Sequence, residues 1–302
     1  MIKRRMFDAV RVSKKQWQNW SYSIAVIALV YLFIEVGRWF GQLVVLLGMN
    51  TIPSHIIQFL FYNLDPLFLQ LLVFLFIAIL LFVWVKFVEK RSLSDLGLYR
   101  QKVYRQLLWG WLIGAVMISA VVGLQLITGA LQVSLVVITS AGFINLLGIA
   151  PFWFIQSGTE ELLTRGWLFP TISKKTSLII GTAVSSLLFS ILHIQNPSIS
   201  WISFLNIGLF GLLASLYVLL TDNIWGISAL HAAWNCFQGN FYGLPISGIQ
   251  PAYSLFYLSP TGKPDYLTGG MFGPEGSLYS SLVMILVIIL LSFRLWKKKE
   301  VA

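Results

Sequence analysis

Two adjacent glutamates, Glu160 and Glu161, interrupt a stretch of sequence that is otherwise apolar enough to cross a membrane. Residues 141–156 before them are nearly all apolar, and Arg165 follows four residues after Glu161. A charged side chain at the centre of a bilayer costs about 2.5–3.5 kcal/mol on insertion scales, so such a residue has either a partner or a task. These three residues therefore indicate a structural ion-pair network or a functional site, and we favour the functional site.

The composition places the chain among integral membrane proteins. Of its 302 residues, 57% are hydrophobic and only 11% are charged, whereas a soluble domain has roughly 25% charged residues. The single cysteine, Cys236, excludes an internal disulfide and a cysteine-rich metal site.

Apolar runs of about 20 residues, the length that crosses a bilayer, recur along the chain. They predict an all-α polytopic membrane bundle of eight helices in one integral domain, residues 1–302. The expected helices run from about Trp20 to Gly48, Leu67 to Val85, Gln106 to Ile127, Ala141 to beyond Glu161, Ser177 to Ile194, Trp201 to Leu220, Ile224 to Gly239 and Ser281 to Trp296. Residues 92–99 read as a short amphipathic connector.

The basic residues are unevenly distributed. They gather in Lys3–Lys15, Lys86–Arg105, Lys174–Lys175 and Arg294–Lys299, and the stretches between these clusters are nearly free of them. Clusters that alternate with bare loops follow the positive-inside rule, which predicts that both termini are cytoplasmic. The net charge of +10 therefore indicates contact with anionic lipid headgroups rather than with nucleic acid.

Three other charged residues, two in the first expected helix and one in a later loop, are interpreted as structural. Glu35 and Arg38 are three residues apart and can pair on one helix face. Residues 242–277 are rich in Gly, Pro and Ser and predict a long extracytoplasmic loop with ordered or re-entrant structure, because structureless loops of that length are uncommon. Within this loop, Glu275 is read as loop structure rather than as part of a substrate gate.

Helical spacing places the polar residues of the core on particular faces. Glu161 and Arg165 are four residues apart and can form an ion pair, whereas Glu160 is rotated by about 100° from its neighbour and faces a different environment. His193 lies at a depth similar to that of Glu160. His231 follows Asp222 by nine residues, so either this turn is recessed or the hairpin at Lys174 protrudes.

These residue types allow a limited chemistry. A carboxylate can act as general base on a water that attacks a carbonyl, while a histidine and an asparagine amide stabilise the oxyanion. Alternatively, Glu160, His193 and His231 could bind a divalent metal such as zinc, which lowers the pKa of its bound water. Both routes lead to hydrolysis, and a peptide bond is the expected target.

Three short motifs occur in order within membrane-like sequence. They are Glu-Glu-Leu-Leu-Thr-Arg-Gly at 160–166, Phe-Ser-Ile-Leu-His at 189–193 and His-Ala-Ala-Trp-Asn at 231–235. Together they resemble the signatures of the CAAX-protease and bacteriocin-processing (CPBP, or Abi) intramembrane endopeptidases, which are relatives of the type II CAAX prenyl endopeptidase. The similarity is strong over residues 141–239 and loose over the first three helices.

The resemblance implies a catalytic role for four residues. Glu160 would be the general base, and His193 would help to hold the water. His231 and Asn235 would form the oxyanion site. Because Asn235 suits an oxyanion donor better than a zinc ligand, we expect no metal cofactor, with zinc as the alternative.

The resemblance also implies supporting residues. Glu161 and Arg165 would orient the site or hold the polar end of the substrate. Phe189 would pack beside the water, and Asn206 would support the substrate or the structure. Residues 141–240 would then be the catalytic core, preceded by the N-terminal helices and followed by the outer loop and last helix in 241–302.

We therefore expect a multi-pass intramembrane endopeptidase of the cell membrane. Its partners would be the lipid bilayer and a small or membrane-associated peptide or protein precursor, with or without a lipid group. The main alternative is a non-catalytic bacteriocin-immunity or partner-binding protein. A transporter with a carboxylate–histidine proton relay is a third reading, but the internal repeats that many transporters contain are not visible.

Overall fold

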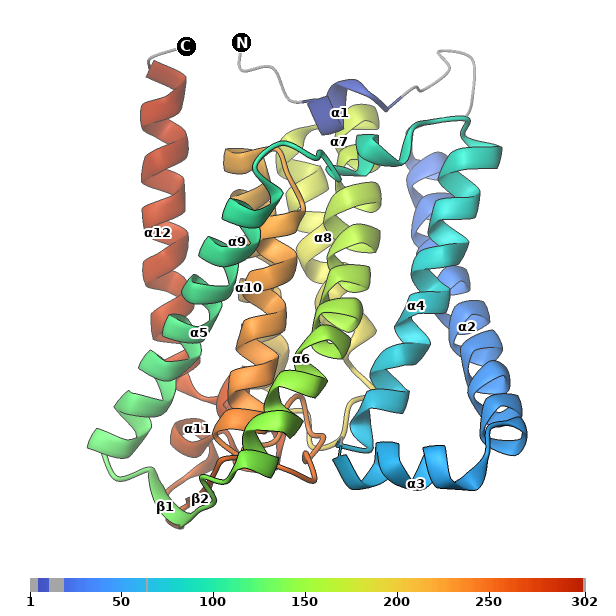
Figure 1. The fold of residues 1–302 in the computed structure, drawn as a ribbon. Coiled ribbons are helices and arrows are strands. Elements are labelled where there is room, and N and C mark those ends of the chain that lie inside the picture. The colour runs from blue at the N-terminus through green and yellow to red at the C-terminus, as the bar shows by residue number, and fades with distance from the viewer. Residues whose placement is uncertain (1–4, 11–18, 64, 301–302) are drawn as a thin grey trace.

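The computed structural model describes residues 5–10, 19–63 and 65–300, and most of the basic cluster Lys3–Lys15 lies outside them. The described chain is a bundle of helices with a small two-stranded ribbon at one end (Figure 1). The α-helices and strands are α1 (Arg5–Asp8), α2 (Asn19–Thr51), α3 (Ser54–Asn63), α4 (Leu67–Val83), α5 (Val103–Ile127), β1 (Leu131–Val136), α6 (Ser140–Glu161), α7 (Phe169–Lys175), α8 (Leu178–Leu192), α9 (Trp201–Thr221), α10 (Trp225–Cys236), β2 (Phe256–Pro260), α11 (Asp265–Thr268) and α12 (Leu278–Glu300).

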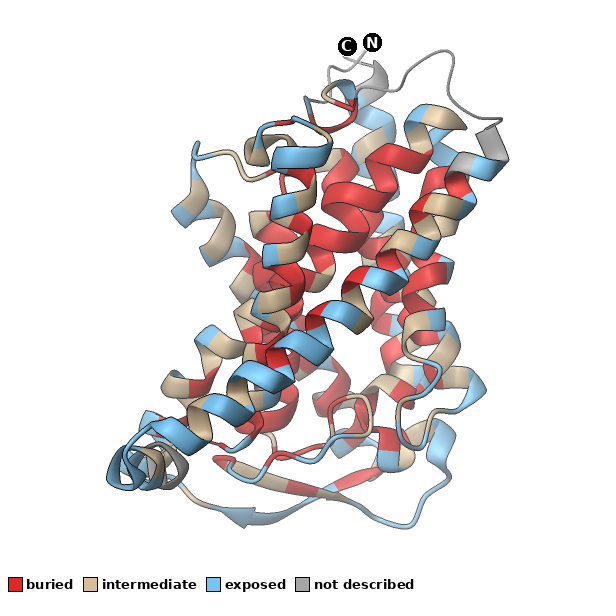
Figure 2. Ribbon diagram, turned by 90° about the vertical axis from the view of Figure 1, so that its right-hand side faces the viewer, coloured by how far each residue is buried: buried red, intermediate tan, exposed pale blue. Residues whose placement is uncertain are grey.

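The predicted class, an all-α polytopic membrane bundle, is confirmed. Each expected membrane helix has a counterpart in α2, α4, α5, α6, α8, α9, α10 and α12. Within the described residues, six helices are long and apolar enough to cross a membrane, and α8 and α10 are shorter. Buried residues concentrate along the middle of the bundle, while the outer helix faces are exposed as membrane helices require (Figure 2).

The helix that carries the two glutamates continues well beyond them. Three helical segments follow one another without a break from Ser140 to Lys175: α6, a π-helical segment at Leu162–Leu168, and α7. Pro170 lies in the first turn of α7, where the missing N–H of proline is tolerated. The π-helical segment begins directly after Glu161, and such segments often occur at functional sites.

Helix α10 is the central helix of the bundle. Every residue from Gly226 to Cys236 is buried, and α5 and α6 flank it. Gly110 and Gly114 allow α5 to approach closely, because a Cβ at Gly114 would lie 2.1 Å from the carbonyl oxygen of Leu230. Small residues four apart are a common device for close packing of membrane helices. This contact sets the position of α10 immediately before His231.

The turn between α9 and α10 is covered by other segments. The Asp222 carboxylate accepts hydrogen bonds from the backbone N–H groups of Arg5 and Met6 at 2.8 and 3.2 Å. The N–H of Ile224 donates to the carbonyl of Gly97, which ends a short 3₁₀ helix at Leu93–Leu96 in the predicted connector. The turn is therefore recessed, which is one of the two arrangements that the sequence left open.

The basic clusters of the described chain lie at one end of the bundle. The α4–α5 connection, the α7–α8 turn and the end of α12 all meet there, beside α1 (Figure 1). Lys298 near the end of α12 donates to the carbonyl of Leu220 at 2.9 Å, close to the α9–α10 turn. Assignment of this end to the cytoplasm stays a prediction from the charge pattern.

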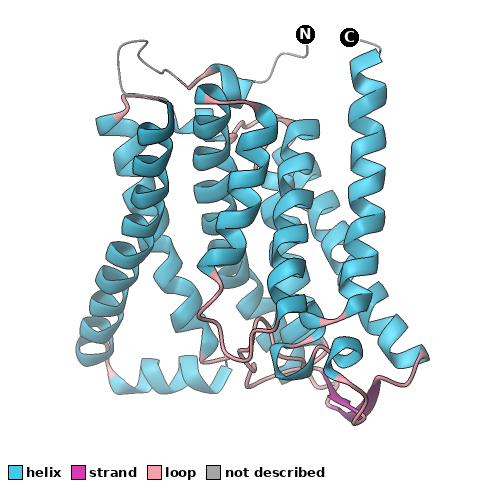
Figure 3. Ribbon diagram, turned by 180° about the vertical axis from the view of Figure 1, so that it is seen from behind, coloured by secondary structure: helices cyan, strands magenta, loops and turns pink. Residues whose placement is uncertain are grey.

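The opposite end is built from loops, α3, α11 and the ribbon (Figure 3). The expectation of an ordered loop at 242–277 is confirmed. Strands β1 and β2, which the sequence reading did not include, pair antiparallel from Leu131↔Pro260 to Val136↔Phe256. Asp65, buried before α4, joins this end by accepting from the N–H groups of Ala252 and Tyr253 at 2.8 and 3.0 Å.

We predict that Gly114→Ala lowers the free energy of unfolding by about 1–3 kcal/mol, the usual cost of forcing extra volume into a packed interior. The added methyl group would collide with the Leu230 carbonyl and push α10 away from α5. Thermal unfolding of the purified protein in detergent would measure the change.

Gly123→Ala is the matched control, because it makes the same change on α5 where a Cβ would meet no atom within 4 Å. It should be neutral or slightly stabilising, since alanine favours helix more than glycine does. Equal effects of the two substitutions would contradict the close-packing argument.

Candidate active site

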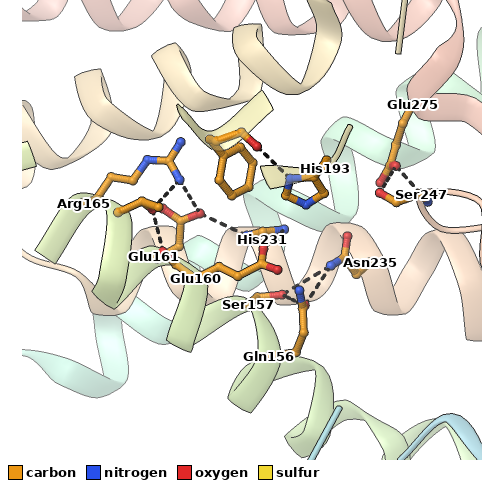
Figure 4. A network of polar contacts seen from close by, with 12 residues as sticks. Gln156, Ser157, Glu160, Glu161, Arg165, His193, His231, Asn235, Ser247 and Glu275 are labelled. Atoms are coloured by element: carbon orange, nitrogen blue, oxygen red, sulfur yellow. Dashed lines mark hydrogen bonds and ion pairs between the residues drawn. The ribbon is translucent and has the colours of Figure 1, made fainter. Parts of the chain in front are cut away.

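A cavity of about 230 Å³ lies inside the bundle and contains most of the predicted site residues. Its exposed rim includes Arg38 on α2 and Gln70 on α4. The polar residues that line it are Arg38, Gln70, Gln156, Glu160, Thr164, His193, Asn196, Asn206, His231, Asn235, Ser247 and Glu275. The structure thus brings Glu160, the two histidines and Asn235 to one space (Figure 4).

Glu161 and Arg165 form the predicted ion pair behind the cavity wall. Their side chains are 0% exposed, and Nη1 of Arg165 lies 3.3 Å from Oε1 of Glu161. The same Nη1 donates to the hydroxyl of Thr164 at 2.7 Å. Neither member of the pair lines the cavity. Of the two roles that the resemblance implied for them, their burial favours orienting the site over contact with the substrate.

Phe189 stands between this ion pair and the histidines. Its ring packs against the Arg165 guanidinium, with 4.3 Å from the guanidinium carbon to the ring centroid, a favourable cation–π distance. The ring centroids of His193 and His231 lie 4.7 and 6.0 Å from that of Phe189. Phe189 also lines the cavity. Its ring therefore contacts the Arg165 guanidinium and both imidazoles at once.

His231 lies between the two glutamates. Its Nδ1 is 3.0 Å from Oε1 of Glu161, and its Nε2 is 3.9 Å from Oε2 of Glu160. The Glu161 carboxylate, which also pairs with Arg165, is the acceptor of this bond, so Nδ1 of His231 carries a proton and Nε2 faces Glu160. The helical rotation between Glu160 and Glu161 therefore places them on either side of one imidazole.

Glu160 is the carboxylate that reaches the cavity. Its side chain is 17% exposed, against 0% for Glu161. Oε2 of Glu160 is buried and has no hydrogen-bond partner within the described residues. An unsatisfied buried acceptor is costly, and this one can take a proton or a hydrogen bond from a group that enters the cavity.

His193 closes α8 at the cavity. Its Nδ1 lies 2.7 Å from the backbone carbonyl of Phe189. Because a carbonyl only accepts, Nδ1 carries the proton, which leaves the Nε2 lone pair for the cavity. His193 can therefore accept a hydrogen bond from a water beside Glu160.

Asn235 is held by the helix opposite. Its Nδ2 donates to Oε1 of Gln156 at 3.2 Å and to the hydroxyl of Ser157 at 3.3 Å, both on α6. These long bonds fix the amide one turn beyond His231, with its side chain at the cavity wall. The sequence reading did not identify Gln156 and Ser157, although they lie in the same apolar helix as the glutamates.

Asn206 lines the cavity and also connects α9 to the outer segment. Its Nδ2 donates to the carbonyls of Glu275 and Ser277 at 2.7 and 2.8 Å, and its Oδ1 accepts from Ser281. It anchors the outer segment to α9, which is the structural alternative that the sequence offered for this residue.

Glu275, which the sequence interpreted as loop structure rather than as part of a substrate gate, lines the same cavity as Glu160. No helical spacing links the two residues, so only the folding back of the outer loop could bring them together. The sequence did contain one signal for this position, an acidic residue within a Gly- and Pro-rich loop.

Among the described residues, no group of three or more His, Cys, Asp or Glu side chains is placed to hold a metal ion. A tetrahedral zinc site needs three protein ligands within about 2.3 Å of the ion. Glu160, His193 and His231 share the cavity wall without forming such a set.

Comparison with known families supports the resemblance over part of the chain. Residues 141–237 match the family described as type II CAAX prenyl endopeptidase Rce1-like. Over this segment the chain is similar to the CPBP family. The match covers α6 to α10, the segment that carries all three motifs, and the N-terminal helices and Glu275 lie outside it. Neither the curated proteins nor the solved structures include a match to this chain.

We predict that Arg165→Met lowers the free energy of unfolding by about 3–5 kcal/mol, because Glu161 would be left as an unpaired buried charge. Adding Glu161→Gln should recover much of this loss, since replacing a whole buried pair is often nearly neutral. Thermal or chemical unfolding in detergent would give both values.

Arg38→Met is the matched control for this loss. Arg38 also has a glutamate partner on its own helix, but the pair is 51% and 44% exposed and 3.8 Å apart. Exposed pairs contribute about 0–1 kcal/mol, so the control should be close to wild type. A loss in Arg165→Met no larger than in the control would contradict the assigned burial.

Proposed function

We propose that this protein is an intramembrane endopeptidase in which Glu160 activates a water to hydrolyse a peptide bond. The substrate would be a small or membrane-associated peptide or protein precursor. The observation that carries the proposal is the convergence of Glu160, His193, His231 and Asn235, from three separate motifs, on one cavity inside a membrane bundle. The Rce1-like match over 141–237 supports a peptidase.

Water activation is the first step. A water between Glu160 and His193 would give its proton to the Glu160 carboxylate while its oxygen attacks the carbonyl carbon of the scissile bond. The unsatisfied Oε2 of Glu160 is a suitable proton acceptor, and Nε2 of His193 is free to hold the water in place. General-base assistance of this kind contributes about 10²–10⁴-fold to a rate.

The tetrahedral oxyanion would be stabilised by His231 and Asn235. His231 already donates from Nδ1 to Glu161, so it needs a second proton on Nε2 to donate to the oxyanion. The carboxylates of Glu160 and Glu161 flank this ring. Asn235 would exchange one of its long bonds to α6 for a bond to the oxyanion, which is worth more where water is excluded.

Collapse of the intermediate completes the reaction. The C–N bond breaks, and the proton taken up by Glu160 passes to the leaving amine. Glu160 thus returns to the carboxylate form, and the products are a carboxylic acid and an amine. No residue is consumed, so one carboxylate serves first as base and then as acid.

Glu161 and Arg165 would act through the residues that they position. Glu161 fixes the His231 ring by its bond to Nδ1, and Arg165 holds both Glu161 and the ring of Phe189. Such supporting contacts keep reacting groups within the narrow geometry that catalysis needs.

We predict that Glu160→Gln lowers peptide hydrolysis by about 10²–10⁴-fold without unfolding the protein, because the amide cannot accept the proton from water. Release of peptide fragments by the purified protein, followed by mass spectrometry, would measure the rate. Glu35→Gln removes the same charge from α2 and should hydrolyse peptides like wild type.

Immunity without catalysis would be favoured by two results together. The wild-type protein would cleave no peptide, and Glu160→Gln would protect cells as well as the wild-type protein does. Transport of a solute coupled to protons, lost in Glu160→Gln, would instead favour the relay. The cleavage assay therefore separates the three classes.

We further propose that the reaction needs no metal, because Asn235 suits an oxyanion donor better than a zinc ligand. Exhaustive dialysis against a strong chelator should leave the hydrolysis rate within about twofold of the untreated protein, because Glu160 alone can activate the water. Loss of activity that zinc restores would overturn this proposal while leaving the peptidase assignment intact.

A further inference from the structure

Glu275 brings a second carboxylate into the cavity from outside the family-matched segment. It lies in a 3₁₀ turn, Pro274–Gly276, and lines the cavity opposite the α6 glutamates (Figure 4). Its Oε2 accepts from both the N–H and the hydroxyl of Ser247, at 3.0 and 2.7 Å. Both bonds go to Oε2, and the proposed hydrolysis does not use Oε1.

The segments that hold Glu275 are fixed on both sides. Asn206 on α9 donates to its backbone carbonyl. Ser247 and Gly248 have φ values of +48° and +87° and form the tip of a tight turn closed by Ile246 and Ile249. The N–H of Gly248 donates to the carbonyl of Phe272. A non-glycine residue in the left-handed region costs energy and is common at binding sites.

The charges around the cavity leave Glu275 without a cation. Arg165 forms an ion pair with Glu161 behind the cavity wall. Arg38 lies at the exposed rim beside Glu35. Of the lining residues that the structure describes, Arg38 is the one Lys or Arg, and no ion pair joins a described residue to Glu275. The charge-bearing groups whose electrostatic effect reaches it are His193 and His231.

Burial raises the pKa of the Glu275 carboxyl, because loss of water outweighs the bonds from Ser247 and the nearby imidazoles. A carboxylate that has lost its water is unstable unless a proton or a cation compensates it. A positively charged group that enters the cavity would supply this compensation and form a strong, charge-assisted hydrogen bond.

We propose that Glu275, oriented by Ser247, is a specificity subsite that binds the side chain of a lysine or arginine near the scissile bond of the substrate. Oε1 of Glu275 would accept a hydrogen bond from the substrate cation while Oε2 stays bonded to Ser247. The inference rests on the proposed peptidase function and adds a substrate class to it: peptides with a basic residue at one fixed position.

A peptide panel tests the subsite directly. Each peptide carries one lysine, moved residue by residue along a fixed sequence, and is compared with the same peptide carrying the uncharged isostere norleucine. At one position, lysine should raise kcat/KM by about 10- to 100-fold, the range that a buried charge-assisted bond gives.

Three variants assign this preference to Glu275. Glu275→Gln should bring the lysine-to-norleucine ratio close to one while hydrolysis of the norleucine peptide continues, and Glu275→Asp should restore part of the ratio. Asp265→Asn is the matched control: it removes a carboxylate from the same outer segment at an exposed position, and it should keep the wild-type ratio. A purely structural role would lower both rates equally.

A binding measurement separates this inference from the peptidase proposal. Fluorescence polarisation would give the affinity of Glu160→Gln for labelled lysine and norleucine peptides, with and without Glu275→Gln. Tighter binding of the lysine peptide only where Glu275 is present supports the subsite, even if no peptide is cleaved. Equal affinities, or a ratio of kcat/KM that Glu275→Gln does not change, would overturn it.

Discussion

The buried contact among Glu161, Arg165 and His231 is the interaction on which the rest of the site depends. Charges at membrane depth are tolerated where they compensate one another, and here a carboxylate, a guanidinium and an imidazole meet with almost no exposed surface. Glu161 pairs with Arg165 behind the cavity wall, while the neighbouring Glu160 faces the cavity. One buried pair thus separates two adjacent carboxylates into a buried group and a cavity-facing group.

The helix framework makes this separation geometrically possible. A π-helical segment starts directly after Glu161 and changes the rotation of the residues that follow, including Arg165. Two glycines on α5 bring that helix against α10, which carries both His231 and Asn235. The depth of these residues is therefore set by backbone contact between helices rather than by adaptable side chains.

Much of this arrangement could be predicted from the sequence, because it depends on local periodicity. Length and hydropathy indicated the helices, and a spacing of four residues indicated the Glu161–Arg165 pair. The depth of His231 could not be decided, since it depends on how the α9–α10 turn is covered by α1 and the connector. Glu275 was assigned to loop structure, because nothing local shows that a loop residue folds back to a distant helix.

The sequence by itself determined the membrane bundle and the family that its core resembles, since apolar length, helical period and short motifs are properties of short segments. Only the tertiary structure decided how His231 lies between Glu160 and Glu161, and that the outer loop adds Glu275 and Ser247 to the wall. These features arise from contacts between residues up to roughly a hundred positions apart, and packing alone fixes such contacts.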